Sequence, residues 1–489
     1  MHRWSRTSLL IGFVAFLLAG IFAGRNLATW PARLSYPGQQ GSEGVPLVEM
    51  LHLREGVAIY ARPSQNGFDV AVYGPLFYLL GSRLVNPDKP SYFPLRLLSV
   101  AGMLGCAAGC GLLAFWLSRS YLAAFLGPMI FLSYQMVTSF GTLGPSDSVA
   151  LLLFFFGFLV AYRFRSSRTL LLGAPLMTLG VFYKAQYIAG PVAVVLFLFL
   201  TKQYRRAAEF TGLLGVCVLG LFALFQEVVF HDQAFWRHLL VYGASTLSLP
   251  RLEQSLLVFA IMLLLPLLFV VEYLRKFPDK MISCYLICAA FLGIFTYCRE
   301  GSGVQYFFES VLALSALLPV ALARKVAQRV IPLDLIVALG LTLIAAQAFG
   351  VTPPPRPSDM VKYQAMQSFL RRTVPAHATA LGLTAGDLAQ AGLETPFPDL
   401  YLISLLARRG KLSDGDLVSQ IYAQRFSVIV LDVNLEKERD PAWLNYCLTQ
   451  SLRAAIGRDY ELEATLDMPS PEKQRPPERF WVYVPRRAK

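Results

Sequence analysis

The sequence is poor in charge and has no cysteine framework. Only 15% of its 489 residues are charged, whereas 55% are hydrophobic. Water-facing domains carry about 25% charged residues, so much of this chain must face something other than water. Most of the seven cysteines fall in apolar runs, where Cys behaves as a small hydrophobe, and only Cys298 and Cys447 lie outside them. This spacing fits neither a disulfide framework nor a zinc site, although it does not exclude a divalent metal.

Long apolar runs recur along the first 350 residues. A membrane helix needs about 20 apolar residues, so the runs predict about eleven spans in a polytopic helical bundle. The runs are Leu9–Ala23, Leu97–Leu117, Tyr121–Val137, Val149–Ala161, Leu170–Phe182, Ile188–Leu200, Leu213–Phe225, Leu256–Val271, Ile282–Tyr297, Val311–Leu322 and Leu333–Ala348.

The basic residues between these runs are distributed asymmetrically. Alternate connectors, beginning with the N-terminus, carry fifteen Lys and Arg, whereas the other short connectors carry only Lys184, Arg237, Arg251 and Arg299. By the positive-inside rule the N-terminus is cytoplasmic. The net charge of +13 therefore reflects topology, and no separate basic face indicates nucleic-acid binding.

Two segments differ from the apolar runs. Residues 25–91 follow the first run and are too long for a simple connector, so we expect a folded loop on the outer membrane surface. Residues 351–489 begin with a proline-rich linker and then become polar. The β-branched run Ser427–Asp432 predicts a buried strand, with further strands at Glu461–Leu466 and Arg479–Val484. The sequence thus predicts a membrane domain over 1–350 and an extracytoplasmic α/β domain over 351–489.

Carboxylates near the outer membrane face are the first catalytic candidates, because charge there is costly unless it is used. The loop offers Glu43, Glu49, Glu55, Asp69 and Asp88, and a carboxylate placed there could act as a general base on an acceptor hydroxyl. The alternative interpretation of each is a solvated loop charge.

The later outer connectors contain a second group of polar residues. Asp147 precedes an apolar run, where a carboxylate also complements the helix dipole. Lys184 interrupts an apolar stretch, and Arg299 opens a glycine-rich turn that leads to Gln305 and Tyr306. Arginine beside such a turn is suited to a phosphate, although tight membrane turns also use glycine and basic side chains also anchor to lipid headgroups.

Several short motifs, in this order and at these places relative to the apolar runs, resemble the C-superfamily of membrane glycosyltransferases. The likeness is to its bacterial branch of lipid A aminoarabinose transferase and protein O-mannosyltransferase-like proteins, and it covers essentially the whole chain. The motifs are Ser42-Glu43-Gly44, Glu55-Gly56 with Tyr60, Tyr73-Gly74-Pro75-Leu76, Arg96-Leu97-Leu98-Ser99, Ser146-Asp147-Ser148, Lys184-Ala185-Gln186 and Gly301-Ser302-Gly303-Val304-Gln305-Tyr306.

The resemblance implies an inverting transfer of a sugar from a polyprenyl-phosphate donor to a lipid, glycan or protein acceptor, on the outer face of a bacterial inner membrane. Glu43 inherits the role of base, with Glu49 second, and Ser42 stands where the family has Asp. The donor-binding residues would be Lys184, Arg299, Gln305, Tyr306, Arg96 and Asp147. No cofactor is implied.

Two other functions remain open. A lipid or sugar transporter, or flippase, would also be polytopic, but such proteins often contain two related halves and no internal repeat is evident here. A catalytically inactive relative that serves as an envelope scaffold would account for the Ser at position 42.

Overall fold

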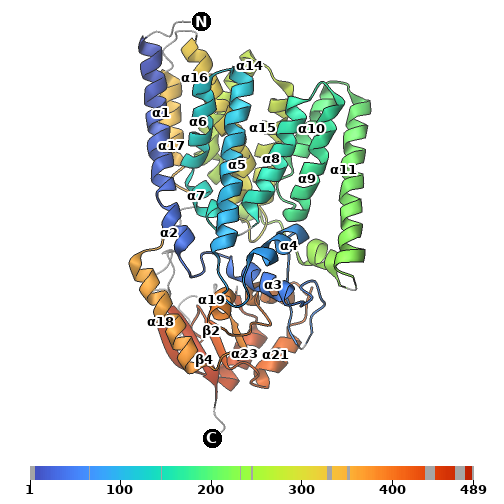
Figure 1. Ribbon diagram of the computed structural model, residues 1–489, viewed down its shortest axis with the longest axis vertical. Coiled ribbons are helices and arrows are strands. Elements are labelled where there is room, and N and C mark those ends of the chain that lie inside the picture. The colour runs from blue at the N-terminus through green and yellow to red at the C-terminus, as the bar shows by residue number, and fades with distance from the viewer. Residues whose placement is uncertain are drawn as a thin grey trace.

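The molecule consists of a helical bundle and a small α/β domain, with two short helices between them (Figure 1). The computed structural model describes residues 6–64, 66–144, 146–231, 233–243, 246–327, 333–349, 353–435, 447–467 and 479–486. Helix α1 (Arg6–Leu27) begins at one end of the bundle, and the α/β domain lies at the opposite end. The two intervening helices are α3 (Gly44–Arg54) and α4 (Pro75–Leu84), both from the first loop.

Each of the eleven apolar runs lies mainly within helical segments of the bundle. These are α1 (Arg6–Leu27), α5 (Phe93–Ser118), α6 (Tyr121–Ser133) with α7 (Gln135–Gly141), α8 (Asp147–Arg163), α9 (Gly173–Tyr183), α10 (Ala189–Leu200), α11 (Tyr204–Leu224), α13 (Leu249–Phe259) with α14 (Leu265–Lys276), α15 (Lys280–Tyr297), α16 (Phe308–Ala327) and α17 (Leu333–Ala345). Among the described residues, six helices are long and apolar enough to cross a membrane, or seven if the bent pair α6–α7 is one span. Several of the other helices are shorter than 18 residues, which is why the length test gives fewer spans than the eleven runs.

The helices differ sharply in how far their neighbours cover them. In the apolar window of the span that contains α16, 94% of the residues are buried, whereas the figure for the α11 span is 6%. Large side chains such as Val216 and Leu219 on α11 are exposed. A helix that is apolar on every side and yet uncovered is suited to lipid contact. Thus α16 is central to the bundle and α11 is peripheral.

Basic connectors meet at one end of the bundle. Arg165 pairs with Asp279 at 3.2 Å, and Arg168 pairs with Glu209 at 3.4 Å. The guanidinium of Arg324 lies over the ring of Phe277, two residues before Asp279. These connectors belong to the set that the sequence analysis places in the cytoplasm, so the charge asymmetry corresponds to one physical end of the bundle.

The α/β domain contains one mixed four-stranded sheet with the order β1-β2-β4-β3. Strands β1 (Ala380–Gly382) and β2 (Val428–Leu431) are parallel, and β3 (Tyr460–Asp467) and β4 (Arg479–Pro485) complete the sheet in antiparallel fashion. The helices are α18 (Pro357–Thr373), α19 (Ala385–Gln390), α20 (Leu400–Arg408), α21 (Gly415–Tyr422) and α23 (Gln450–Asp459). The predicted membrane bundle with a C-terminal α/β domain is therefore confirmed as the fold.

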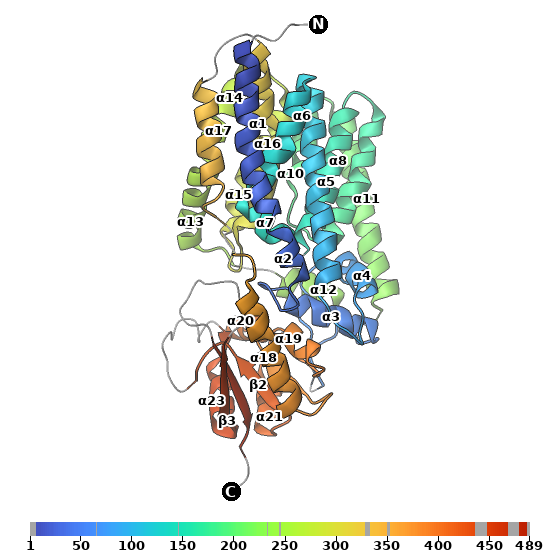
Figure 2. The same ribbon diagram turned by 60° about the vertical axis from the view of Figure 1, so that its left-hand side comes forward.

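Strand β2 is the centre of this domain, because its residues alternate between two apolar cores. Val428 and Val430 pack with α18 and α19, whereas Ile429 and Leu431 pack with α20, α21 and α23. All four residues are buried, as the β-branched run predicted. The second core also includes Phe68 from the first loop, so the α/β domain is packed directly on that loop. Figure 2 shows α18 beside the sheet, with α19 and α20 turned toward the bundle.

Candidate active site

Glu43 lies at the start of α3, where it forms a fully buried ion pair with Arg96 of α5. Its Oε1 also accepts a hydrogen bond from the backbone N–H of Gln40 at 2.8 Å, and its Oε2 accepts one from Gly144 at 2.9 Å. Both carboxylate oxygens are therefore occupied. These contacts favour a structural role for Glu43, since an acceptor hydroxyl would have to displace one of them.

Arg96 uses its whole guanidinium group to hold the first loop. Its Nε and Nη2 donate to Glu43, and Nη1 donates to the carbonyl oxygens of Arg33 and Tyr36. The second Nη2 hydrogen is directed to the carbonyl of Gly38 at 2.7 Å. An arginine has five N–H donors, and here each has a partner within the chain. Arg96 therefore retains no donor for a phosphate. Its hydrogen bonds hold residues 33–43 against α5, and we call this arrangement the Arg96 clamp.

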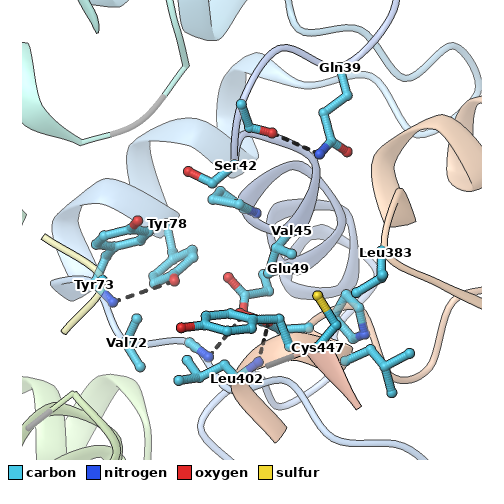
Figure 3. Close-up of a pocket in the computed structure, with 18 of the residues that line it drawn as sticks. Gln39, Ser42, Val45, Glu49, Val72, Tyr73, Tyr78, Leu383, Leu402 and Cys447 are labelled. Atoms are coloured by element: carbon cyan, nitrogen blue, oxygen red, sulfur yellow. Dashed lines mark hydrogen bonds between the residues drawn. The ribbon is translucent and has the colours of Figure 1, made fainter. Parts of the chain in front are cut away.

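Glu49, six residues further along in α3, lines a pocket of about 330 Å³ between the first loop and the α/β domain (Figure 3). Its side chain is 2% exposed, and its Oε1 accepts a hydrogen bond from the backbone N–H of Ala71 at 2.8 Å. The remaining lining is largely apolar, with Val45, Val72 and Leu402 around the carboxyl group. Of the two loop carboxylates that the sequence favoured, Glu49 is the one that faces a cavity.

The environment of Glu49 raises the pKa of its carboxyl group well above the usual range. Burial is the main cause, and the negative charge of Asp69 adds to it, while hydrogen bonds from Tyr78 and Ala71 act in the opposite direction. A carboxyl group with a raised pKa is a stronger base once it is ionised. Glu49 thus combines access to a pocket with the electrostatic character of a general base.

The α/β domain supplies two further carboxyl groups to the same pocket, Asp399 and Asp432. Asp399 precedes α20 and accepts a hydrogen bond from the backbone N–H of Leu402 at 2.8 Å, so it also caps that helix. Burial raises the pKa of Asp399 to about 6. Neither residue stands out in the sequence, because nothing in the local pattern places the start of α20 against α3.

Asp147 and Lys184 form the second part of the site. Asp147 begins α8, as predicted, and its Oδ1 accepts hydrogen bonds from Lys184 Nζ at 2.8 Å and from the Tyr187 hydroxyl at 2.5 Å. Lys184 ends α9 and lies over the ring of Tyr73, with Nζ 5.1 Å from the ring centroid. Tyr73 lines the pocket of Glu49, so a chain of contacts joins the lysine to that pocket.

Gly74 allows this approach of the first loop to α9. Its backbone N–H donates to the carbonyl of Tyr183 at 3.3 Å, and an added Cβ would overlap the carbonyl oxygen of Phe182. Gly74 precedes Pro75, which starts α4 at the position where proline is favoured. The Tyr73-Gly74-Pro75 motif therefore packs the loop closely against the end of α9, next to Lys184.

The glycine-rich turn approaches the same region from the other side. Gly301 lines the pocket, and the carbonyl oxygen of Gln305 lies 3.5 Å from the Tyr187 hydroxyl. Arg299 and Arg251 are both close enough to act electrostatically on Tyr306. The structure therefore brings together Asp147, Lys184, Gln305 and Tyr306, with Arg299 near Tyr306, and leaves Arg96 in its separate clamp.

Within the described part of the chain, several buried polar atoms beside this network have no hydrogen-bond partner. They include the side-chain amide of Gln186, Oε1 of Gln305, and the hydroxyls of Ser146 and Ser148 on either side of Asp147. Each such group costs free energy unless water or a ligand satisfies it. Among the described residues, no group of three or more His, Cys, Asp and Glu side chains is arranged to hold a metal ion.

Comparison with solved structures identifies the fold. The crystal structure of ArnT from Cupriavidus metallidurans bound to undecaprenyl phosphate superposes with a TM-score of 0.56 over 95% of this chain and 97% of that one, at 11% sequence identity. The chain has the ArnT fold. The apo structure of the same protein gives the same TM-score at 10% identity over the same shares of both chains.

The fold that the sequence resemblance implies is thus confirmed. An oligosaccharyltransferase from Archaeoglobus fulgidus also matches, over 92% of this chain and 71% of that one, with 11% identity and a TM-score of only 0.40. No family model matches the sequence. No curated protein matches it either.

Proposed function

We propose that the protein is a glycosyltransferase that moves a sugar from a polyprenyl-phosphate donor to an acceptor hydroxyl, with Glu49 as the base. The observation that carries the proposal is the position of Glu49, in a pocket between the first loop and the α/β domain, within reach of the Lys184 network through Tyr73. The ArnT fold over almost the whole chain, and the undecaprenyl phosphate bound by that ArnT, support the donor class.

In this mechanism Glu49 takes the proton of the acceptor hydroxyl while the hydroxyl oxygen attacks the anomeric carbon of the sugar. The bond between that carbon and the phosphate oxygen breaks, the polyprenyl phosphate leaves with the bonding electrons, and the anomeric configuration inverts. Because the phosphate leaves already charged, it needs cations more than a proton. Lys184, held by Asp147, and Arg299 would supply them. The side-chain amide of Gln186 would donate to or accept from the donor head group, and Oε1 of Gln305 would accept from it.

The proposal places the pocket outside the cytoplasm of a bacterial inner membrane. This orientation follows from the basic connectors, which lie at the end of the bundle away from the α/β domain. Reporter fusions at Arg165, Arg205 and Arg324 should give a cytoplasmic signal, and fusions at Asp88 and Arg486 should give an outer signal. A cytoplasmic signal at Arg486 would contradict the orientation and the proposed lipid donor side.

The test of the activity uses the full-length protein in liposomes, with a panel of polyprenyl-phosphate sugars labelled in the sugar. A transferase releases free polyprenyl phosphate in proportion to the labelled product. A transporter or flippase instead moves the label across the bilayer with the sugar–phosphate bond intact, and a scaffold does neither. Release that is lost in Lys184→Ala but retained in the outer-connector control Arg237→Ala would support the proposal.

A further inference from the structure

The described lining of the Glu49 pocket is acidic, whereas the chain as a whole is basic. Its lining contains three carboxyl side chains, those of Glu49, Asp399 and Asp432, and its described residues include no Lys, Arg or His. The chain as a whole has 44 Lys and Arg against 31 Asp and Glu. The absence of cations among the described lining residues is therefore a local feature and does not follow from the composition.

The carboxyl groups come from two different parts of the molecule. Glu49 belongs to α3, whereas Asp399 precedes α20 and Asp432 directly follows β2. Glu49 and Asp399 interact, because the charge of Asp399 contributes to the raised pKa of Glu49. A second anion placed in this pocket would meet the same repulsion.

The cations of the site are directed elsewhere. Lys184 pairs with Asp147 and reaches the pocket only through the ring of Tyr73, and Arg251 donates to the carbonyl of Ser302 at 2.9 Å. Arg409 of the α/β domain, half-buried at the interface, pairs with Glu300. In the part of the chain that the structure describes, the charges that could bind a phosphate therefore lie outside the lining of the Glu49 pocket.

The size and lining of the pocket limit the acceptor further. Its volume of about 330 Å³ suits a small group, and Val45, Val72, Leu383, Leu402 and Tyr78 provide apolar walls beside the three carboxyls. A ligand that matches these walls presents hydrophobic surface, with hydroxyl groups directed to the carboxyl oxygens.

We propose that the acceptor carries an uncharged hydroxyl on a compact apolar scaffold, and that acceptors with a phosphate next to the reacting hydroxyl are excluded. This inference rests on the proposed function, because Glu49 marks the acceptor side of the reaction. In it, the α/β domain selects the acceptor: Asp399 repels anions from the pocket where Glu49 accepts the proton.

The test measures binding without any donor, so that it does not depend on transfer. Phenyl β-glucoside and its 6-phosphate are matched probes that differ only in the phosphate, and each is titrated by calorimetry into the full-length protein in nanodiscs. We expect the neutral probe to bind at least about tenfold more tightly than the phosphorylated one, as expected for a dianion near like charges in a partly buried site. In Asp399→Asn this ratio should shrink by about threefold or more.

The substitution is chosen to keep the fold. Asn is as good a helix cap as Asp, so Asp399→Asn removes the charge and retains the start of α20. The matched control is Asp416→Asn, at an exposed position in the first turn of α21, and it should leave the ratio unchanged. Equal or tighter binding of the phosphorylated probe would overturn the inference, and so would a failure of both probes to bind. Neither result would decide the proposed function, which is tested independently by transfer from the donor.

Discussion

The carboxylate of Glu43 and the guanidinium of Arg96 form a fully buried ion pair that joins the first loop to α5. The backbone N–H groups of Gln40 and Gly144 complete the coordination of this carboxylate. The pair thus fixes the start of α3, and with it the direction in which Glu49 points. A residue that resembles the family's base in sequence here supports the loop that presents a different carboxyl group.

Glu43→Gln should therefore act mainly on stability. Removing one partner of a buried ion pair leaves the other charge uncompensated, at a cost of about 3–5 kcal/mol. We expect a marked fall in the thermal midpoint of the purified protein, with near-normal turnover in the fraction that remains folded. An unchanged midpoint together with abolished transfer would show that Glu43 is the base after all.

Lys184→Ala should raise the KM for the donor by about ten- to a hundredfold, since a charge-assisted hydrogen bond contributes about 1.5–3 kcal/mol. Lys184→Arg should recover part of this loss, because it keeps the charge near Asp147. Donor titration of both variants measures the effect. A normal donor KM in Lys184→Ala would restrict the lysine to its structural pairing with Asp147.

Arg299→Ala should also weaken donor use by about ten- to a hundredfold, because a phosphate in a desolvated site would lose a bidentate partner. Arg299→Lys should restore it only in part, since Lys cannot donate in parallel from one plane. The control is Arg237→Ala, another basic residue of the outer connectors. Similar donor kinetics for Arg299→Ala and Arg237→Ala would indicate that Arg299 only contacts lipid headgroups.

Asp387 predicts how stability depends on pH. It accepts a hydrogen bond from the backbone N–H of Gln39 at 2.9 Å, and so joins the α/β domain to the first loop. Burial, with a contribution from Glu43, raises the pKa of Asp387 from 3.8 to about 7. The folded protein therefore holds this proton more tightly than the unfolded chain. The resulting stability is fully present below about pH 4 and is lost as the pH rises to about 7.

Asp387→Asn should remove this dependence, because the amide oxygen still accepts the hydrogen bond but carries no proton to lose. Above pH 7 the variant should be more stable than the wild type by about 2–4 kcal/mol, and near pH 4 the two should be similar. Thermal midpoints across pH 4–8 provide the measurement. A variant that is less stable than the wild type at pH 8 would contradict the assignment.

The sequence was sufficient to predict the bundle and the nature of the tail. Apolar runs of helical length and the charge of their connectors are local signals, and so is the β-branched run that becomes β2. Asp147 and Lys184 could each be selected as candidates from the sequence. Their contact could not be predicted, because they lie 37 residues apart and no local pattern links them.

The choice between Glu43 and Glu49 could not be made from the pattern alone. Both lie in the same loop, and the difference between them arises from their surroundings: an ion pair with Arg96 for Glu43, and burial near Asp69 and Asp399 for Glu49. The contribution of the α/β domain to the pocket was likewise invisible, because it depends on the docking of that domain on α3. Three-dimensional contacts, and not residue type, decide which carboxyl group is available.

The most direct test of the central claim compares Glu49→Gln with the wild type in transfer of labelled sugar from a polyprenyl-phosphate donor. Gln keeps the size of the side chain and can still accept the hydrogen bond from Ala71, but it cannot take a proton. The account predicts a loss of about 10² or more in turnover at an undiminished thermal midpoint, while the wild-type rate rises with pH as Glu49 ionises. Wild-type turnover in Glu49→Gln, measured on folded protein, would contradict it.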